Sequence, residues 1–274
     1  MNKILAIVVT YFPDIELLDE NIKSFVEYVD EILIWENTPF DERVKHRLPA
    51  IAKVTYVDGG ISNTGISKAL NYAWHYAMAN GYDYLLTMDQ DSVWQNFEVF
   101  ITNTIYKKET PKGLWGPHRN LDIRSTPIIE PTADLITSGM LVSIDILNKI
   151  GGWCEDFFVD GVDIDLCFHA IELNIPVLYI NGCTLRQRFG EPEIKHLFGR
   201  SFSVSNRPAK RLYYIYRNLL FACRKYPKTK PYQKPFLQYR SSQVKFILLG
   251  EQHRVRKLLA IIAGTIVGYL KPIK

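Results

Sequence analysis

Two aspartates separated by one residue follow an apolar segment of the chain. Asp89 and Asp91 flank Gln90, directly after the run 82–89, which is typical of a buried strand. In an open parallel sheet, ligands bind beyond the carboxyl ends of the strands. Two carboxylates at such a break can both reach a divalent cation, and Mg²⁺ or Mn²⁺ prefers oxygen ligands that it can bridge to a diphosphate. A solvated turn would explain the tripeptide alone, but its position after a strand favours a metal site.

A second acidic cluster precedes a helix expected over 163–174. Five carboxylates fall between Glu155 and Asp165. Asp163 and Asp165 would occupy the first helical turn, where the helix dipole favours the charged form of a carboxylate. A carboxylate held there can act as general base on a sugar hydroxyl. Ordinary helix capping is the alternative for this stretch.

A third segment, 63–71, is a glycine-containing loop that leads into a helix expected over 64–80. Exposed N–H groups at a helix start suit a phosphate, a nucleobase or a sugar. Taken alone, this segment is equally well explained as a helix cap.

The elements that must position these residues alternate between strand and helix patterns. Strands are expected over 4–11, 31–37, 52–58 and 82–89, with helices starting after Asp14 and at 64. This order predicts a mostly parallel sheet with helices on both faces. Beyond it, we expect a strand pair or bent strand over 132–144, a short helix over 145–150 and a strand over 176–180. The predicted domains are 1–220 and a C-terminal extension, 221–274.

Charge is distributed unevenly along the 274 residues. Residues 1–185 carry a net charge of −13 and residues 186–274 a net charge of +17. The basic part implies an anionic partner, which could be membrane lipid, nucleic acid or a phosphorylated substrate, unless the two parts neutralise each other. The apolar run 258–270 is shorter than a bilayer requires. Four cysteines without metal-binding spacing are typical of reduced thiols in a cytoplasmic protein.

Together these segments resemble the family 2 glycosyltransferases of the GT-A fold, and within them the bacterial rhamnosyltransferase-like group. The resemblance covers about residues 4–220. Its motifs are IVVTYFPD at the first strand, Glu36-Asn37 after the second, the loop N-x-G-(I/V)-(A/S)-x-A-x-N, then DYxLTxDQDS, TSGMLVS and GGWCEDFFVDGVDIDLCFHA. It implies an α/β, Rossmann-like fold with a mostly parallel sheet flanked by helices, here followed by a basic helical extension.

The resemblance also implies roles for individual residues. Asp163 matches the position of the catalytic base, with Asp165 supporting it, and Asp89 and Asp91 match the ligands of Mg²⁺ or Mn²⁺. The residues expected to bind the donor are Thr10, Tyr11, Pro13, Glu36, Asn63, Gly65, Ser67, Asn71, Asp89 and Gln90.

Three departures from the family pattern bear on these roles. The family's H-x-x-G after the last core strand is replaced by Gln187-Arg188-Phe189-Gly190, which removes a possible metal ligand. Arg186 or Arg188 would then neutralise phosphate directly. His169 stands where an arginine is usual in the base-bearing helix. The Q-x-x-R-W of processive synthases is absent from the sequence, which favours addition of a single sugar.

The expected function is therefore that of an inverting, metal-dependent enzyme at the inner face of the cell membrane. It would move L-rhamnose from dTDP-L-rhamnose to a glycan or polyprenyl-diphosphate-linked acceptor in cell-surface glycan synthesis. Anionic lipid would bind the extension, unless 258–270 packs as a core helix or forms a homodimer interface. The alternatives are a galactofuranosyl- or hexosyltransferase that uses a UDP-sugar, a nucleic-acid-binding protein suggested by the basic, Tyr-rich stretch 200–240, and an inactive sugar-sensing scaffold. Nucleic-acid binding leaves both acidic clusters unexplained, and the intact aspartates argue against an inactive scaffold.

Overall fold

The computed structural model describes residues 2–38, 53–60, 62–118, 128–187, 193–197 and 200–273. They form two compact units. The first comprises Met1–Phe158 and Val162–Arg188, and the second comprises Val159–Gly161 and Phe189–Lys274. The division of domains expected at residue 220 stays a prediction, whereas the compact units divide the chain after residue 188.

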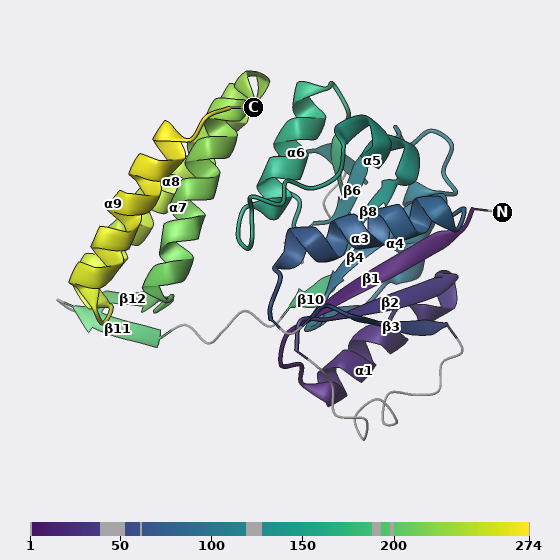
Figure 1. Ribbon diagram of the computed structural model, residues 1–274, viewed down its shortest axis with the longest axis horizontal. Coiled ribbons are helices and arrows are strands. Elements are labelled where there is room, and N and C mark those ends of the chain that lie inside the picture. Colours follow the sequence, from purple (N-terminus) through teal and green to yellow (C-terminus); the bar gives the residue numbers. More distant parts are fainter. Residues whose placement is uncertain are drawn as a thin grey trace. The chain divides into compact units, whose positions relative to one another are not determined.

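A twisted, mostly parallel sheet forms the centre of the first unit (Figure 1). Within the described residues it has eight strands in the order β3-β2-β1-β4-β8-β6-β9-β7. Their bounds are β1 Ile4–Thr10, β2 Glu31–Glu36, β3 Val54–Asp58, β4 Tyr84–Asp89, β6 Leu114–Pro117, β7 Ile129–Pro131, β8 Met140–Ser143 and β9 Val177–Ile180. Strands β1 to β4 are all parallel, whereas β8 runs antiparallel to β4 and β6.

The register of the parallel strands brings their carboxyl ends to one edge of the sheet. Thr10 lies opposite Glu36, Glu36 opposite Asp58, and Val9 opposite Asp89. Almost every side chain of β1, β2 and β4 is buried, as expected for strands that are covered on both faces of the sheet. The four strands predicted from the sequence are confirmed, and the loops that follow them share this edge.

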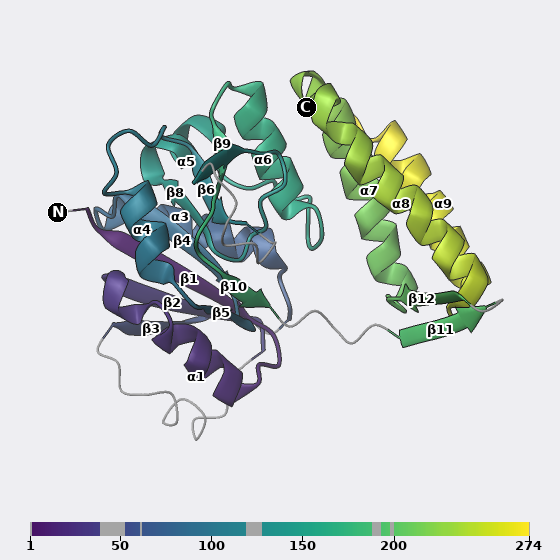
Figure 2. The ribbon, with the colours of Figure 1, turned by 180° about the vertical axis from the view of Figure 1, so that it is seen from behind.

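Helices cover both faces of the sheet, as Figures 1 and 2 show together. Leu18, Ile22, Phe97 and Phe100 pack against one face, from helices α1 and α4, in a core shared with β1, β2 and β4. Helix α3 packs against β1 and β4 from the other face. The bounds are α1 Ile15–Lys23, η1 Val26–Tyr28, α3 Ile66–Ala79, α4 Phe97–Thr104, α5 Ile144–Ile150 and α6 Val162–Glu172. Asp14 caps α1 as predicted, since its carboxylate accepts from the backbone N–H groups of residues 16 and 17.

The expected strand pair or bent strand over 132–144 is wrong for most of its length. Only β8 forms there, over Met140–Ser143, and β7 ends at Pro131. Gly139 at φ +79 turns the chain immediately before β8, so the β-branched pattern of 132–138 belongs to a loop. A small antiparallel pair, β5 (Ser92–Trp94) with β10 (Leu185–Gln187), was not predicted.

The second unit consists of a hairpin and three long helices. Its elements are β11 Glu193–Leu197, β12 Arg200–Val204, α7 Ala209–Lys225, η2 Pro227–Thr229, α8 Lys230–Gly250 and α9 Arg254–Leu270. This confirms the basic helical extension expected from the sequence. Helix α9 lies directly on α7, because a Cβ atom on Gly264 or Gly268 would come within 2.4 and 2.5 Å of the Tyr213 and Arg217 carbonyl oxygens.

The opposite face of α9 is apolar and exposed. Val255, Leu259, Ile262, Ile266 and Leu270 recur every three or four residues and are 52–72% exposed. The interpretation of 258–270 as a core helix therefore holds for one face only. Among the helices that the structure describes, none has both the length and the apolar character that crossing a bilayer requires.

Candidate functional site

The loops at the carboxyl edge of the sheet are linked by side-chain amides. Gln90 binds both backbone groups of Tyr11: the Tyr11 N–H donates to Gln90 Oε1 at 2.7 Å, and Gln90 Nε2 donates to the Tyr11 carbonyl at 3.1 Å. Two adjacent strands are thereby held together beyond their ends. The side-chain amide of Gln90 bonds Tyr11 in this structure, and its expected role in donor binding stays a prediction.

Three further residues fix the Asp89–Asp91 corner. Asn21 of α1 is fully buried and donates from Nδ2 to the carbonyls of Asp89 (2.9 Å) and Ser92. The Asp89 N–H donates to Ser138 Oγ at 3.1 Å. Gln187, at the end of β10, donates from Nε2 to Asp89 Oδ2 at 3.2 Å. The corner is thus anchored from α1, from the loop before β8 and from β10.

The two aspartates fit a hard divalent cation. Asp89 and Asp91 are both half-buried and offer oxygen ligands at the carboxyl edge. Among the described residues, no group of three His, Cys, Asp or Glu side chains could hold a metal ion. Two protein carboxylates suffice when a diphosphate supplies further oxygens, as is usual for Mg²⁺ bound to nucleotides. Gln187, which replaces the histidine expected from the resemblance, places a neutral amide beside them.

Of the two arginines considered as phosphate ligands, one forms an ion pair with a glutamate and the other is outside the described part of the chain. Arg186 forms an ion pair with Glu20 of α1, and both side chains are more than half exposed. Arg188, Phe189 and Gly190 are not among the described residues. Neutralisation of phosphate by Arg186 or Arg188 therefore stays a prediction.

Two exposed aromatic rings follow β1. Tyr11 is 50% exposed and Phe12 is 74% exposed, and their ring centroids lie 4.7 Å apart. Phe12 has φ +45, which is uncommon for a residue with a Cβ, and its N–H donates to Thr38 Oγ1 at 2.8 Å. Pro13 is half-buried beside them. Thr10, by contrast, is fully buried and donates its hydroxyl to the Trp35 carbonyl.

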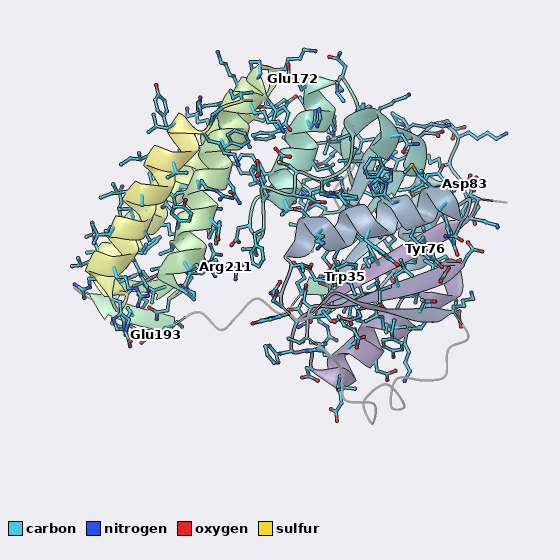
Figure 3. All side chains as sticks on the ribbon, viewed as in Figure 1. Trp35, Tyr76, Asp83, Glu172, Glu193 and Arg211 are labelled. Carbon is cyan, nitrogen blue, oxygen red and sulfur yellow. The ribbon has the colours of Figure 1, made fainter. Side chains whose placement is uncertain are left out.

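Asn37 joins the end of β2 to the glycine-containing loop. Its Oδ1 accepts from Trp35 Nε1 (3.2 Å) and from the Thr64 N–H (3.1 Å), and its N–H donates to the Thr10 carbonyl. Figure 3 labels Trp35 at this edge of the sheet. Glu36, expected to bind the donor, is only 5% exposed.

The segment 63–71 holds the loop that precedes α6. Ser67 Oγ donates to the Phe157 carbonyl at 2.6 Å, and the Asn71 side chain bonds both the N–H and the carbonyl of Trp153. Gly65, at φ +87, lies so close to Phe158 that a Cβ would meet the Phe158 carbonyl oxygen at 2.6 Å. Asn63 accepts from the Gly65 N–H. Ser67 and Asn71 therefore support the acidic segment, and their expected role in donor binding stays a prediction.

Helix α6 begins at Val162 and carries both candidate carboxylates in its first turn. Asp163 is half-buried and its Oδ1 accepts from the Ile164 N–H at 2.9 Å, whereas Asp165 is 3% exposed. Asp163 is thus the more accessible of the two carboxylates, and the roles of Asp163 as base and Asp165 as its support stay predictions.

The three residues before α6 are fixed within the second unit. Asp160 and Gly161 both have positive φ, +54 and +85. Arg211 of α7, labelled in Figure 3, binds the Asp160 carboxylate with two nitrogens at 2.9–3.2 Å. Asn218 donates to the Val159 and Asp160 carbonyls. The turn that leads into Asp163 is therefore restrained on its N-terminal side.

Asn21 and Ser138, which support the acidic corner, were not among the residues predicted from the sequence. A signal for Asn21 exists: it lies between Leu18 and Ile22 on the buried side of α1, where an amide needs a specific partner. Ser138 gives no comparable signal, because a serine in a loop is usually solvated.

Comparison with known proteins gives one relative by sequence and several by structure. No family model matches the chain. The dTDP-rhamnosyl transferase RfbF of Shigella flexneri is 27% identical in an alignment 245 residues long, which covers 82% of this chain and 81% of the relative. The mannosyltransferase PcManGT of Pyrobaculum calidifontis, solved with GDP-Man and Mn²⁺, superposes with a TM-score of 0.57 at 15% identity, over 98% of this chain and 86% of its own. The structure of S. aureus TarS residues 1–349 superposes with a TM-score of 0.54 at 13% identity. The match covers 98% of this chain and 81% of the TarS chain.

These likenesses agree with the fold class expected from the sequence. The structural neighbours establish the fold, and RfbF establishes the sequence relationship. The chain has a GT-A-like fold and is related in sequence to the dTDP-rhamnosyl transferase RfbF.

Proposed function

We propose that this enzyme transfers a single L-rhamnosyl group from dTDP-L-rhamnose to an acceptor hydroxyl with inversion of the anomeric carbon. The carboxyl edge of the sheet carries the proposal, since it joins an exposed aromatic pair to two aspartates that fit a metal–diphosphate. The name of the sequence relative supports the choice of donor.

One group of residues would act on the leaving group of the reaction and another on the nucleophile. Asp89 and Asp91 would hold Mg²⁺ or Mn²⁺, which when bound neutralises charge on the departing diphosphate. Asp163 accepts the proton of the acceptor hydroxyl as the oxygen attacks the anomeric carbon from the face opposite the diphosphate. The bond to the diphosphate oxygen breaks in the same displacement, so the configuration inverts. Asn71, Ser67 and Gly65 hold the loop that leads toward Asp163.

The exposed Tyr11 and Phe12 rings are suited to stack on the base of the nucleotide. A flat apolar face recognises any base, so discrimination between dTDP and UDP depends on the thymine methyl and on the missing 2′-hydroxyl. One methyl group in an apolar contact contributes only about 1–3 kcal/mol, which is roughly 10- to 200-fold in affinity.

Calorimetry with Mn²⁺ should therefore show dTDP binding at least about 10-fold more tightly than UDP. Tyr11→Ala should weaken both nucleotides by a similar factor, because stacking does not depend on the methyl group. Tyr106→Ala, at an equally exposed tyrosine after α4, is the matched control. A clear preference for UDP would instead assign the enzyme to the galactofuranosyl- or hexosyltransferases that use UDP-sugars.

We further propose that the enzyme works at the inner face of the cytoplasmic membrane on a glycan or polyprenyl-diphosphate-linked acceptor. The support is the exposed apolar face of α9 within a segment of strong positive charge. Aliphatic residues that dip into the headgroup boundary, next to cations that meet lipid phosphates, bind such a surface reversibly. No contact with nucleic acid is needed to explain the charge.

Co-sedimentation with liposomes tests this proposal. Full-length protein should bind vesicles that contain phosphatidylglycerol and release them in high salt, because surface attraction is screened. Leu259→Gln combined with Ile266→Gln should lower binding by at least about 10-fold, since two aliphatic side chains that become buried in the lipid contribute several kcal/mol. Substitution is preferable to truncation at Gly250, which would uncover the face of α7 that α9 covers.

Met78→Gln combined with Val99→Gln removes two exposed aliphatic residues from the first unit and should leave vesicle binding unchanged. Equal vesicle binding by the Leu259/Ile266 and Met78/Val99 double variants would contradict the membrane assignment. A loss of dimer in sedimentation velocity, restricted to the α9 pair, would identify that face as a homodimer interface instead.

A further inference from the structure

A cavity of about 390 Å³ lies in the second unit where two long helices begin. Helices α7 and α9 both start at the end of the unit that carries the β11–β12 hairpin (Figures 1 and 2). The cavity is lined by Asn206, Arg207, Pro208, Ala209, Lys210, Gln252, His253, Arg256 and Lys257. Among the residues that the structure describes, this lining includes four Lys or Arg side chains and a histidine, but no carboxylate.

The carboxylates closest to the cavity are already matched by lysines. Glu251 is buried and binds Lys257 Nζ at 2.6 Å, and both side chains are at most 5% exposed. Glu193 on β11 is paired with Lys195. Asn206 bonds both glutamates, through its N–H to Glu251 and through Nδ2 to Glu193. Lys257 therefore adds no free charge to the cavity. The excess positive charge of the cavity comes from Arg207, Lys210 and Arg256.

Two further observations bear on the positive charge around the cavity. Burial lowers the pKa of the Arg240 guanidinium and the nearby charge of Arg207 lowers it further, whereas Tyr239, Tyr216 and Asp160 raise it. The starts of α7 and α9 also lack a side-chain cap, because Pro208 and His253 occupy the cap positions. Backbone N–H groups in the first turns of these helices add to the positive potential at the cavity.

We propose that this cavity binds a phosphate or diphosphate group, at a second site separate in sequence from the nucleotide edge formed by residues 10–91. Planar guanidinium groups suit phosphate oxygens, and three cations can neutralise one diphosphate. The proposal deepens the membrane association proposed above, because the exposed apolar face of α9 starts at Val255, beside Arg256. The phosphate belongs either to an anionic lipid headgroup or to a free diphosphate.

Binding measurements on the full-length chain distinguish these sources. Metal-free calorimetry with inorganic pyrophosphate, in an Asp91→Asn background, reports on the cavity without the catalytic corner. Co-sedimentation with vesicles of phosphatidylglycerol and phosphatidylcholine reports on the headgroup. Arg207→Gln combined with Arg256→Gln should weaken binding by about 10- to 30-fold, since each cation near an anionic surface contributes about 1 kcal/mol.

Lys234→Gln combined with Lys245→Gln removes the same charge from exposed positions on α8 and serves as the control. Weaker binding by the Arg207/Arg256 double variant, but not by the Lys234/Lys245 control, supports the site. If only vesicle binding weakens, the phosphate belongs to a lipid headgroup. If only pyrophosphate binding weakens, it belongs to a free diphosphate. Equal effects of the two pairs, or none, would overturn it. Lys210→Gln provides a milder variant if the double substitution fails to fold. None of these measurements needs turnover, so an inactive enzyme that still binds through the cavity would refute only the transferase proposal.

Discussion

Replacing Asp163 with asparagine is expected to lower kcat by about 10²–10⁴-fold while leaving the affinity for the donor nearly unchanged. The expected loss is that of a positioned general base, because asparagine cannot accept a proton from the acceptor hydroxyl. The substitution keeps the Oδ1 atom that accepts from the Ile164 N–H, so the start of α6 should survive. Steady-state transfer assays and calorimetry with the donor nucleotide measure the two quantities separately.

Asp145→Asn is the matched control, because Asp145 is also an acidic residue in the first turn of a helix, α5, and is exposed. Its effect on kcat should be small. Asp165→Asn tests the division of roles: the buried Asp165 should affect thermal stability more than Asp163 does. An Asp165→Asn enzyme that folds normally and is less active than Asp163→Asn would reverse the assignment.

The second large effect concerns the acidic corner. Asp91→Asn should lower transfer by at least about 10²-fold, since a weaker hold on the cation removes leaving-group stabilisation of several kcal/mol. Because Asp91 lies between strands β4 and β5, next to buried Ser92, the neutral isostere should not disturb the fold. Activity measured over a Mn²⁺ titration should show a higher metal requirement and a lower maximum.

Glu98→Gln, at an exposed acidic residue in the first turn of α4, should leave the Mn²⁺ dependence unchanged. Full activity of the native enzyme in EDTA would rule out the metal assignment altogether. Unchanged activity of Asp91→Asn with a normal response to EDTA would move the metal site away from this corner.

The sheet was predictable from the sequence because its strands are short, apolar and regularly separated by helices. Runs of Val and Ile are typical of strands that are buried on both faces of a sheet. Strands β1, β2, β3 and β4 form where these patterns indicate. The loop over 132–138 was mistaken for a strand because β-branched residues near Pro and Gly resemble an edge strand locally. Only the turn at Gly139 and the pairing of β8 with β4 resolve that ambiguity.

The candidate site was predictable in position but less so in the use of each side chain. The carboxyl edge follows from topology, so Asp89, Asp91 and Tyr11 were placed together correctly. Hydrogen-bond partners across 80 residues of sequence leave no local pattern, and so the commitment of Gln90 to Tyr11, or of Asn71 to Trp153, could not be foreseen. Polar residues in a motif can serve the scaffold as well as the ligand.

The double hydrogen bond between Gln90 and Tyr11 has a thermodynamic consequence. A shift of the 89–91 corner on cation binding must displace the backbone of Tyr11, because both of that residue's backbone polar groups are bound to the Gln90 side chain. If the cation and the nucleotide base favour the same position of this joint loop, each strengthens binding of the other by the same coupling free energy. Affinity for the metal and affinity for the base are then two measures of a single loop equilibrium, and neither constant is an independent property of its own half of the donor site.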